Sequence, residues 1–141
     1  MIRLFDYNII LYFDKLDILL EACKTGDLKK VEDICTVHEH IDAVNEKGWT
    51  PLIVATYNNQ IDIVKFLILN GSNIYTTSYN GTNLLMYAKD AFFNQGNIEL
   101  FRLFIDLGLD LNAKDYAGLT LRDYVEKAGY SMEELLDPIE K

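Results

Sequence analysis

Two cysteines and two histidines are the residues of this chain best suited to hold a metal ion. Cys23, Cys35, His38 and His40 lie in one short stretch, and thiolates and imidazoles are ligands that zinc prefers. Their spacing does not match the structural zinc patterns, in which closely spaced pairs of ligands alternate with longer gaps. Both cysteines fall at small or apolar helix positions, so we interpret them as core residues, and we expect both histidines to be solvated. The sequence therefore predicts no metal site.

Catalytic signatures are also missing from the sequence. There is no Gly-rich phosphate loop, nucleophile elbow or metalloprotease helix. The 22 Asp and Glu residues are scattered, and none are paired in the manner of a glycosidase. An acidic tail is most simply a solvated face; it comprises Glu133, Glu134, Asp137 and Glu140. We therefore expect neither an enzyme nor a cofactor.

The charge of the chain limits its partners. The 141 residues fit one domain, and they carry a net charge of −9. That charge disfavours nucleic acid and anionic membranes as partners and favours a protein with a basic surface, although it could serve solubility alone. No apolar run approaches a membrane span and no cleavage site follows the N-terminus, so we expect a cytoplasmic protein.

Three sequence marks recur at a period of about 33 residues, the kind of self-similarity that indicates a repeat architecture. A Gly or Asn and a polar residue precede apolar positions at helical spacing, as in residues 58–67 and 95–104. A loop follows each such helix, with Gly71 or Gly108 where the helix ends. A turn then precedes the next helix, at residues 48–52, 81–85 and 118–122. Thr50 and Thr120 are good N-caps there, and Pro51 suits the first helical position.

At these residues the chain resembles ankyrin repeat proteins. Residues 50–55 read Thr-Pro-Leu-Ile-Val-Ala, which is similar to the family's Thr-Pro-Leu-His-x-Ala signature. Residues 108–115 read Gly-Leu-Asp-Leu-Asn-Ala-Lys-Asp, which is similar to its Gly-Ala-Asp-Val-Asn-Ala-Lys-Asp loop. The resemblance covers roughly residues 16–137. It implies an all-α solenoid of about four helix-turn-helix repeats, with short projecting hairpin-like loops and an N-terminal cap.

We expect one domain over residues 1–141, divided into a cap, three repeats and a C-terminal capping repeat. Their predicted ranges are 1–15, 16–48, 49–81, 82–118 and 119–141. Residues 1–15 precede the first repeat and are strongly apolar, and an open solenoid end needs a cover. We expect a helical cap, with dimerisation or partner docking as the alternative; its apolar residues are Leu4, Phe5, Ile9, Ile10, Tyr12 and Phe13.

Two departures from the repeat pattern lie near the C-terminal half. The third repeat is about four residues longer than the usual period, and the extra residues lie around Phe92 and Phe93. These residues either form an exposed finger or fold back over the neighbouring repeat. The last repeat stops early, and Ser131 with Glu134 predicts a capping box for its final helix.

The resemblance implies that a protein partner binds the concave face, through loop tips and first-helix faces. Trp and Tyr are favoured interface anchors, although Trp49 and Tyr116 could instead pack only against adjacent loops. The predicted contact residues are Glu46, Trp49, Tyr57, Asn58, Tyr79, Asn80, Asp90, Tyr116 and Leu119.

Three functions stay open at this point. We expect a non-catalytic protein–protein interaction module that is a monomer when free. The alternative is an acidic immunity or antitoxin-type inhibitor that occludes a basic toxic enzyme, with electrostatic steering of the encounter. A third possibility is a structural protein that assembles with itself through residues 1–15.

Overall fold

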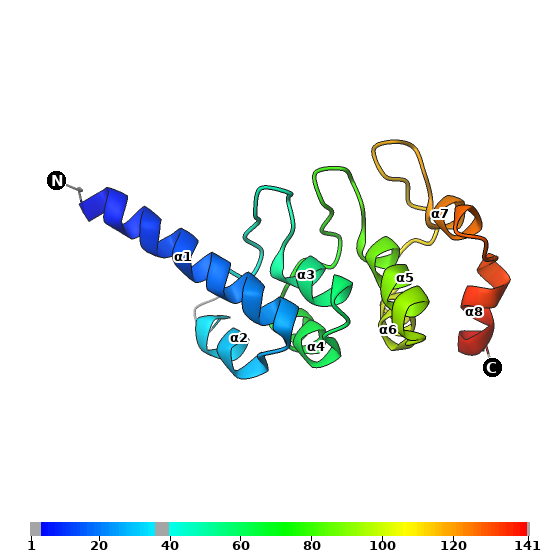
Figure 1. The fold of residues 1–141 in the computed structure, drawn as a ribbon, viewed down its shortest axis with the longest axis horizontal. Coiled ribbons are helices and arrows are strands. Elements are labelled where there is room, and N and C mark those ends of the chain that lie inside the picture. Colours follow the sequence, from blue (N-terminus) through cyan, green and yellow to red (C-terminus); the bar gives the residue numbers. More distant parts are fainter. Residues whose placement is uncertain (1–3, 36–39, 141) are drawn as a thin grey trace.

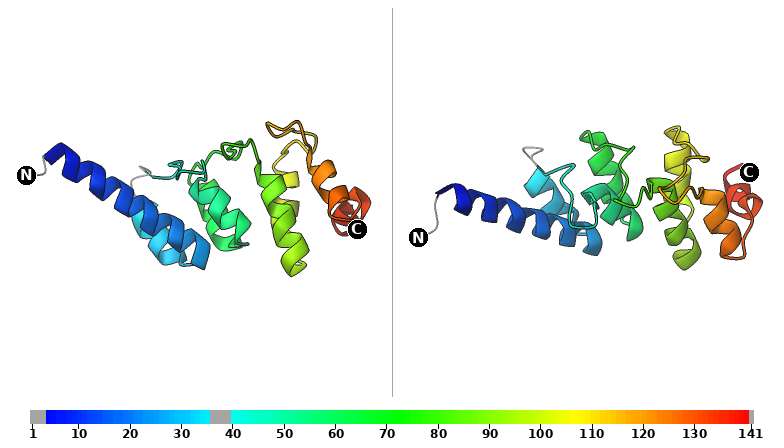
Figure 2. Two further views of the ribbon diagram at one scale, coloured as in Figure 1. Left: turned by 45° about the horizontal axis from the view of Figure 1, so that its top comes forward. Right: turned by 90° about the horizontal axis from the view of Figure 1, so that it is seen from above.

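The chain forms a row of helix pairs joined by projecting loops (Figure 1). The computed structural model describes residues 4–35 and 40–140, and within these ranges no β-strand is formed. The helices are α1 (Leu4–Thr25), α2 (Leu28–Ile34), α3 (Pro51–Tyr57), α4 (Ile61–Leu69), α5 (Leu84–Gln95), α6 (Glu99–Asp106), α7 (Leu121–Lys127) and α8 (Met132–Glu140). Figure 2 shows the first helix of each pair in one layer and the second in another. The predicted all-α repeat solenoid is confirmed.

Each first helix of the later pairs begins at a capping residue that the repeat supplies. The hydroxyl of Thr50 accepts a hydrogen bond from the N–H of Ile53 at 3.2 Å, and Pro51 follows at the first helical position. Asn83 and Thr120 occupy the same place before α5 and α7 and accept in the same way. Side chains at this position satisfy N–H groups that have no partner inside the helix. The repeat period therefore sets where α3, α5 and α7 start.

The core runs along the whole row, between the two helix layers. Its fully buried members come from each pair in turn, so each pair is buried only by its neighbours. This is the arrangement expected of repeats that cannot bury an apolar face alone. Among its members are Leu19, Leu52, Leu67, Leu84, Phe101, Phe104, Leu121 and Leu135.

The extra residues of the third repeat lengthen α5 by a turn. α5 has 12 residues whereas α3 has 7, and it ends at Gly96, which adopts a left-handed conformation. Phe92 and Phe93 lie on this turn and are half-buried. The ring of Phe93 stacks on Tyr130, with centroids 4.4 Å apart. The two phenylalanines therefore fold back over the neighbouring repeat and do not form a finger.

The N-terminal segment is the outer part of one long helix. α1 has 22 residues and α2 only 7, so the outer turns of α1 extend past the helix it packs on (Figure 1). Ile9, Ile10 and Phe13 are exposed, with 55% of Phe13 accessible. The expectation that these three residues cover the core is wrong, because none of the second-layer helices in the described ranges reaches them. The side chains of Leu4 and Phe5 are outside the described part of the chain.

His40 corrects a second expectation. Its side chain is buried, not solvated. The imidazole stacks on the ring of Tyr12, with centroids 4.4 Å apart, and its Nε2 lies 3.1 Å from the carbonyl oxygen of Tyr12. α1 is long enough to bring Tyr12 over the loop that carries His40. His38 lies among residues 36–39, outside the described residues.

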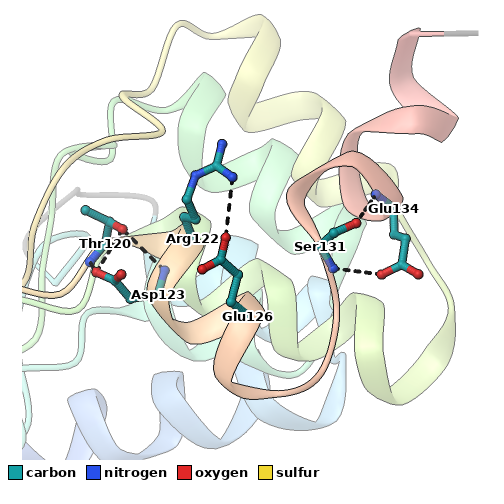
Figure 3. A network of polar contacts seen from close by, with 6 residues as sticks. All are labelled: Thr120, Arg122, Asp123, Glu126, Ser131 and Glu134. Carbon is teal, nitrogen blue, oxygen red and sulfur yellow. Dashed lines mark hydrogen bonds and ion pairs between the residues drawn. The ribbon is translucent and has the colours of Figure 1, made fainter.

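The last pair is closed by polar side chains at its helix starts (Figure 3). Ser131 and Glu134 exchange two hydrogen bonds, of 2.7 and 3.1 Å, which confirms the predicted capping box. Thr120 and Asp123 form a second capping box at the start of α7. Reciprocal caps satisfy two helix N–H groups at once, so a short terminal pair can keep both its helices.

Candidate functional site

The concave face is defined here as the exposed sides of α1, α3, α5 and α7 together with the tips of the three loops above them. The loop tips are residues 45–49, 78–82 and 115–119. Each is closed by a backbone hydrogen bond from its first residue to its fifth, at 3.2, 3.1 and 2.9 Å. The loops stand side by side along the row (Figure 1), so their exposed residues form a continuous edge.

One side chain at the start of each loop holds its tip in shape. Asn45, Ser78 and Asp115 each use one oxygen to accept two backbone N–H groups, from the second and fourth residues beyond. These hydrogen bonds are 2.9 to 3.3 Å long. Short polar side chains favour such local turns. The tips are therefore rigid platforms for the residues they carry.

Successive loop tips are joined to each other by backbone hydrogen bonds. The N–H of Tyr79 donates to the carbonyl of Lys47 at 3.2 Å, and the N–H of Tyr116 donates to the carbonyl of Asn80 at 3.0 Å. Each tyrosine ring also lies against the glycine of the preceding loop, Gly48 or Gly81. Both residues are still mostly exposed, 62% for Tyr79 and 77% for Tyr116. The backbones of the two tyrosines are thus held in place by hydrogen bonds, while their side chains remain accessible to a partner.

An aromatic cluster lies below the first loop. The Trp49 ring centroid is 5.5 Å from that of Tyr57 and 5.5 Å from that of Tyr87. Tyr57 and Tyr87 meet edge to face at 6.2 Å, a geometry that aromatic quadrupoles favour. Tyr87 is buried, Trp49 is half-buried and Tyr57 is 44% exposed. The buried member supports the two that reach the surface.

An open groove of about 470 Å³ runs beside this cluster, between α1, the first loop and α3. Glu46, Trp49, Tyr57 and Asn58, all predicted contact residues, line it together. The side-chain amide of Asn58 donates to the carbonyl of Val54 at 2.8 Å and so closes the end of α3. The remaining lining residues are Asp17, Leu20, Glu21, Lys24, Asn45 and Val54.

Asp90 lies in a separate polar group on α5. Its carboxylate is 3.1 Å from the ammonium of Lys89, and that ammonium also lies 5.3 Å from the ring centroid of Tyr124. The Tyr124 hydroxyl donates a hydrogen bond to Asp115. This bond, with the N–H groups of the third loop, lowers the pKa of Asp115, and it raises the pKa of Tyr124.

The structure thus divides the nine predicted residues into three groups. Four share the groove, four stand on the second and third tips, and Asp90 lies apart on α5. Sequence reasoning missed Tyr87, Asp17 and Glu21. Lys24 also lines the groove, and Asp17 and Glu21 lie seven and three residues before it in the same helix. Residues at this spacing share one face of a helix, so the spacing could have revealed Asp17 and Glu21.

The cysteines and the acidic residues show no arrangement for binding a metal. Within residues 4–35 and 40–140, no group of three or more His, Cys, Asp and Glu side chains could hold an ion. Cys23 and Cys35 are buried and unpaired with each other. Burial, with a smaller effect of Cys35, raises the pKa of Cys23 to about 12, so the thiol stays protonated. No helix in the described ranges has the length and apolarity to span a membrane.

Comparison with known proteins identifies the class. Residues 19–115 match the model of ankyrin repeats in three copies, and the chain belongs to the ankyrin repeat family. It is 32% identical to the mouse B-cell lymphoma 3 protein homolog over 104 residues, which is 73% of this chain and 22% of that protein. It is 26% identical to ankyrin repeat and SOCS box protein 3 of Bos taurus over 105 residues, 72% of this chain and 19% of that protein.

A third relative is viral. An ankyrin repeat protein of Variola virus is 40% identical over 62 residues, 43% of this chain and 11% of that protein. The chain spans about a fifth of the length of the mouse and cattle relatives and less of the viral one. Ankyrin repeats are generally protein–protein interaction modules.

Proposed function

We propose that this chain binds a protein partner across its concave face, with Tyr57, Tyr79 and Tyr116 as its principal anchors. The observation that carries the proposal is that two tyrosines, Tyr79 and Tyr116, are mostly exposed while their backbones are held by tip-to-tip hydrogen bonds. Aromatic side chains with a fixed backbone give contact area at a low cost in entropy. Aromatic surface that stays exposed in the free chain is typical of binding surfaces.

Charge supports a basic partner. The net charge of −9 would accelerate encounter with a positive surface and would oppose a second copy of the same chain. The acidic side chains of the concave face include Glu46, Asp17 and Glu21, all exposed. We therefore expect a chain that is a monomer when free and whose partner association slows as salt is added.

Site-specific photocrosslinking tests the proposal. A photoreactive phenylalanine analogue would replace Tyr79 or Tyr116 in the full chain, and in a matched control it would replace Leu69, at the end of α4 in the other helix layer. Leu69 is 86% exposed, so accessibility does not favour the tip positions. In cells of the source organism, we expect one shared crosslinked protein from both tips and none from position 69.

If position 69 crosslinks to the same protein as strongly as the tips do, the concave face is not the binding surface.

The captured partner also distinguishes an inhibitor from an adaptor. A basic enzyme that loses its activity in the complex would make the chain an inhibitor. A partner that keeps its activity would make it an adaptor.

A further inference from the structure

The groove beside Trp49 combines two features that together suit one kind of side chain. Its lining includes an aromatic wall, formed by Trp49 and the partly exposed Tyr57, and three acidic residues, Asp17, Glu21 and Glu46. We propose that this groove receives an arginine side chain from an extended segment of the protein partner. The inference rests on the proposed function and names the chemistry of one subsite within it.

The carboxylates are available for a partner. Asp17, Glu21 and Glu46 are exposed, and their carboxylates make no ion pair or hydrogen bond with residues 4–35 or 40–140. Asp17 and Glu21 lie four residues apart on α1, so both face the same side of the helix. Glu46 approaches from the first loop. Lys24 also lines the groove, which leaves three negative charges against one positive charge.

One cation of the chain itself lies beside the aromatic wall. The ammonium of Lys47 lies 5.3 Å from the centroid of the Trp49 ring, within the range of cation–π attraction, for which Trp is the best acceptor. Lys47 does not line the groove. A second cation can therefore approach the aromatic wall from the groove itself, where the carboxylates attract it.

Arginine fits these surroundings better than lysine. Its guanidinium is planar, so it stacks on aromatic rings, and its fork of donors can bind two carboxylates at once. The open groove of about 470 Å³ is within the size range of sites that hold a small ligand. Leu20 and Val54 line the groove as well, and they give the aliphatic stem of an arginine an apolar surface to cover.

Trp49 is the single tryptophan of the chain, so its fluorescence reports on the groove directly. The probe is the acetylated, amidated pentapeptide Ala-Ala-Arg-Ala-Ala, titrated into the full chain at low salt. The matched probe contains citrulline, a neutral analogue of arginine, at the central position. We expect a saturable change in fluorescence with the arginine peptide, at least tenfold weaker binding of the citrulline peptide, and weaker binding at high salt.

A protein variant completes the test. Asp17→Asn, Glu21→Gln and Glu46→Gln together remove the charges at nearly constant shape, and because all three residues are exposed, the fold should be kept. We expect about tenfold weaker binding of the arginine peptide, from three partly exposed charge pairs. Asp62→Asn, Asp106→Asn and Glu133→Gln form the control variant; they remove the same number of exposed charges away from the groove and should leave binding unchanged.

Equal responses to the arginine and citrulline peptides would overturn the inference, as would equal binding by the two variants or no saturable response to the arginine peptide. None of these results would affect the tip crosslinks from positions 79 and 116. The arginine subsite and the concave binding face can therefore fail separately. Binding of arginine in the groove without tip crosslinks would leave the subsite standing and would contradict the wider proposal.

Discussion

The contribution of the contact between Tyr116 and Gly81 to stability can be measured by replacing Gly81 with alanine, which adds one methyl group at this position. Gly81 has φ +78°, and a Cβ placed there would lie 2.7 Å from Cδ1 of Tyr116 and 2.8 Å from its backbone nitrogen. Gly118 holds the same place in the last loop with φ +80°, but a Cβ there meets no atom within 4 Å. Gly81→Ala and Gly118→Ala should therefore introduce the same backbone strain, but only Gly81→Ala should also clash with Tyr116.

The expected difference in the free energy of unfolding follows from the interactions that each substitution disturbs. A non-glycine residue in the left-handed region costs about 1 kcal/mol, and Gly118→Ala should lose only that. Gly81→Ala must also displace the Tyr116 backbone, whose N–H donates to the carbonyl of Asn80 at 3.0 Å. That hydrogen bond contributes about 1 kcal/mol, and displacement of the ring adds a further part. We expect a total of about 2.5 kcal/mol for Gly81→Ala.

Urea unfolding, followed by far-ultraviolet circular dichroism, measures both free energies of unfolding. The difference of about 1.5 kcal/mol should appear also as a melting temperature lower by about 5 °C for Gly81→Ala than for Gly118→Ala. Gly48→Ala, which would place a Cβ 2.7 Å from Cδ1 of Tyr79, should behave like Gly81→Ala. Equal destabilisation by the Gly81 and Gly118 substitutions would refute the idea that adjacent tips support each other.

Three further predictions follow from burial and charge. Hydrogen bonds, first that from the Tyr124 hydroxyl, lower the pKa of Asp115 in the folded chain, so this carboxylate stabilises the fold above the unfolded pKa of about 4. Asp115→Asn should therefore be destabilising at pH 7 by urea unfolding, with the difference from the parent closing as the pH falls below about 4. Ile10→Ser with Phe13→Ser should change the free energy of unfolding by less than about 1 kcal/mol, because both side chains are exposed. Cys23, whose thiol pKa is about 12, should react with a chromogenic disulfide reagent at pH 8 only after unfolding in urea.

Each of these three has a contrary result. A constant difference between Asp115→Asn and the parent down to pH 2 would remove the carboxylate charge as the cause. A loss of several kcal/mol from the Ile10 and Phe13 substitutions would mean that the outer turns of α1 do cover the core. In a Cys35→Ser variant, which leaves Cys23 as the single thiol, a rapid reaction of the native chain would contradict the burial of Cys23.

Local signals in the sequence predicted the repeat frame well. Thr50, Pro51 and the Ser131–Glu134 pair act within one turn of a helix, so their types and spacing suffice to place a helix start. The same holds for the glycines of the loops, because a left-handed conformation is a property of one residue. The repeat frame could therefore be predicted from residue types and spacing, whereas the family and its all-α solenoid came from the resemblance of residues 50–55 and 108–115 to the ankyrin signature.

The concave surface was harder to predict, because it depends on which residues of different repeats meet. Tyr87 is apolar in character and lies in a helix, and only the positions of Trp49 and Tyr57 make it the support of an aromatic cluster. His40 is polar and follows no helix pattern, and its burial depends on Tyr12, 28 residues earlier in the chain. Contacts of this kind have no local signature.

The extra turn of α5 shows where this architecture tolerates a change in chain length. α5 starts at its capping residue like its neighbours, so the additional residues emerge at its far end, before Gly96, and the loop tips keep their alignment. An insertion within residues 78–82 would instead separate the N–H and carbonyl groups that join one tip to the next. Length variation among related chains, and peptide tags introduced by design, should therefore collect where first helices end and avoid the tips.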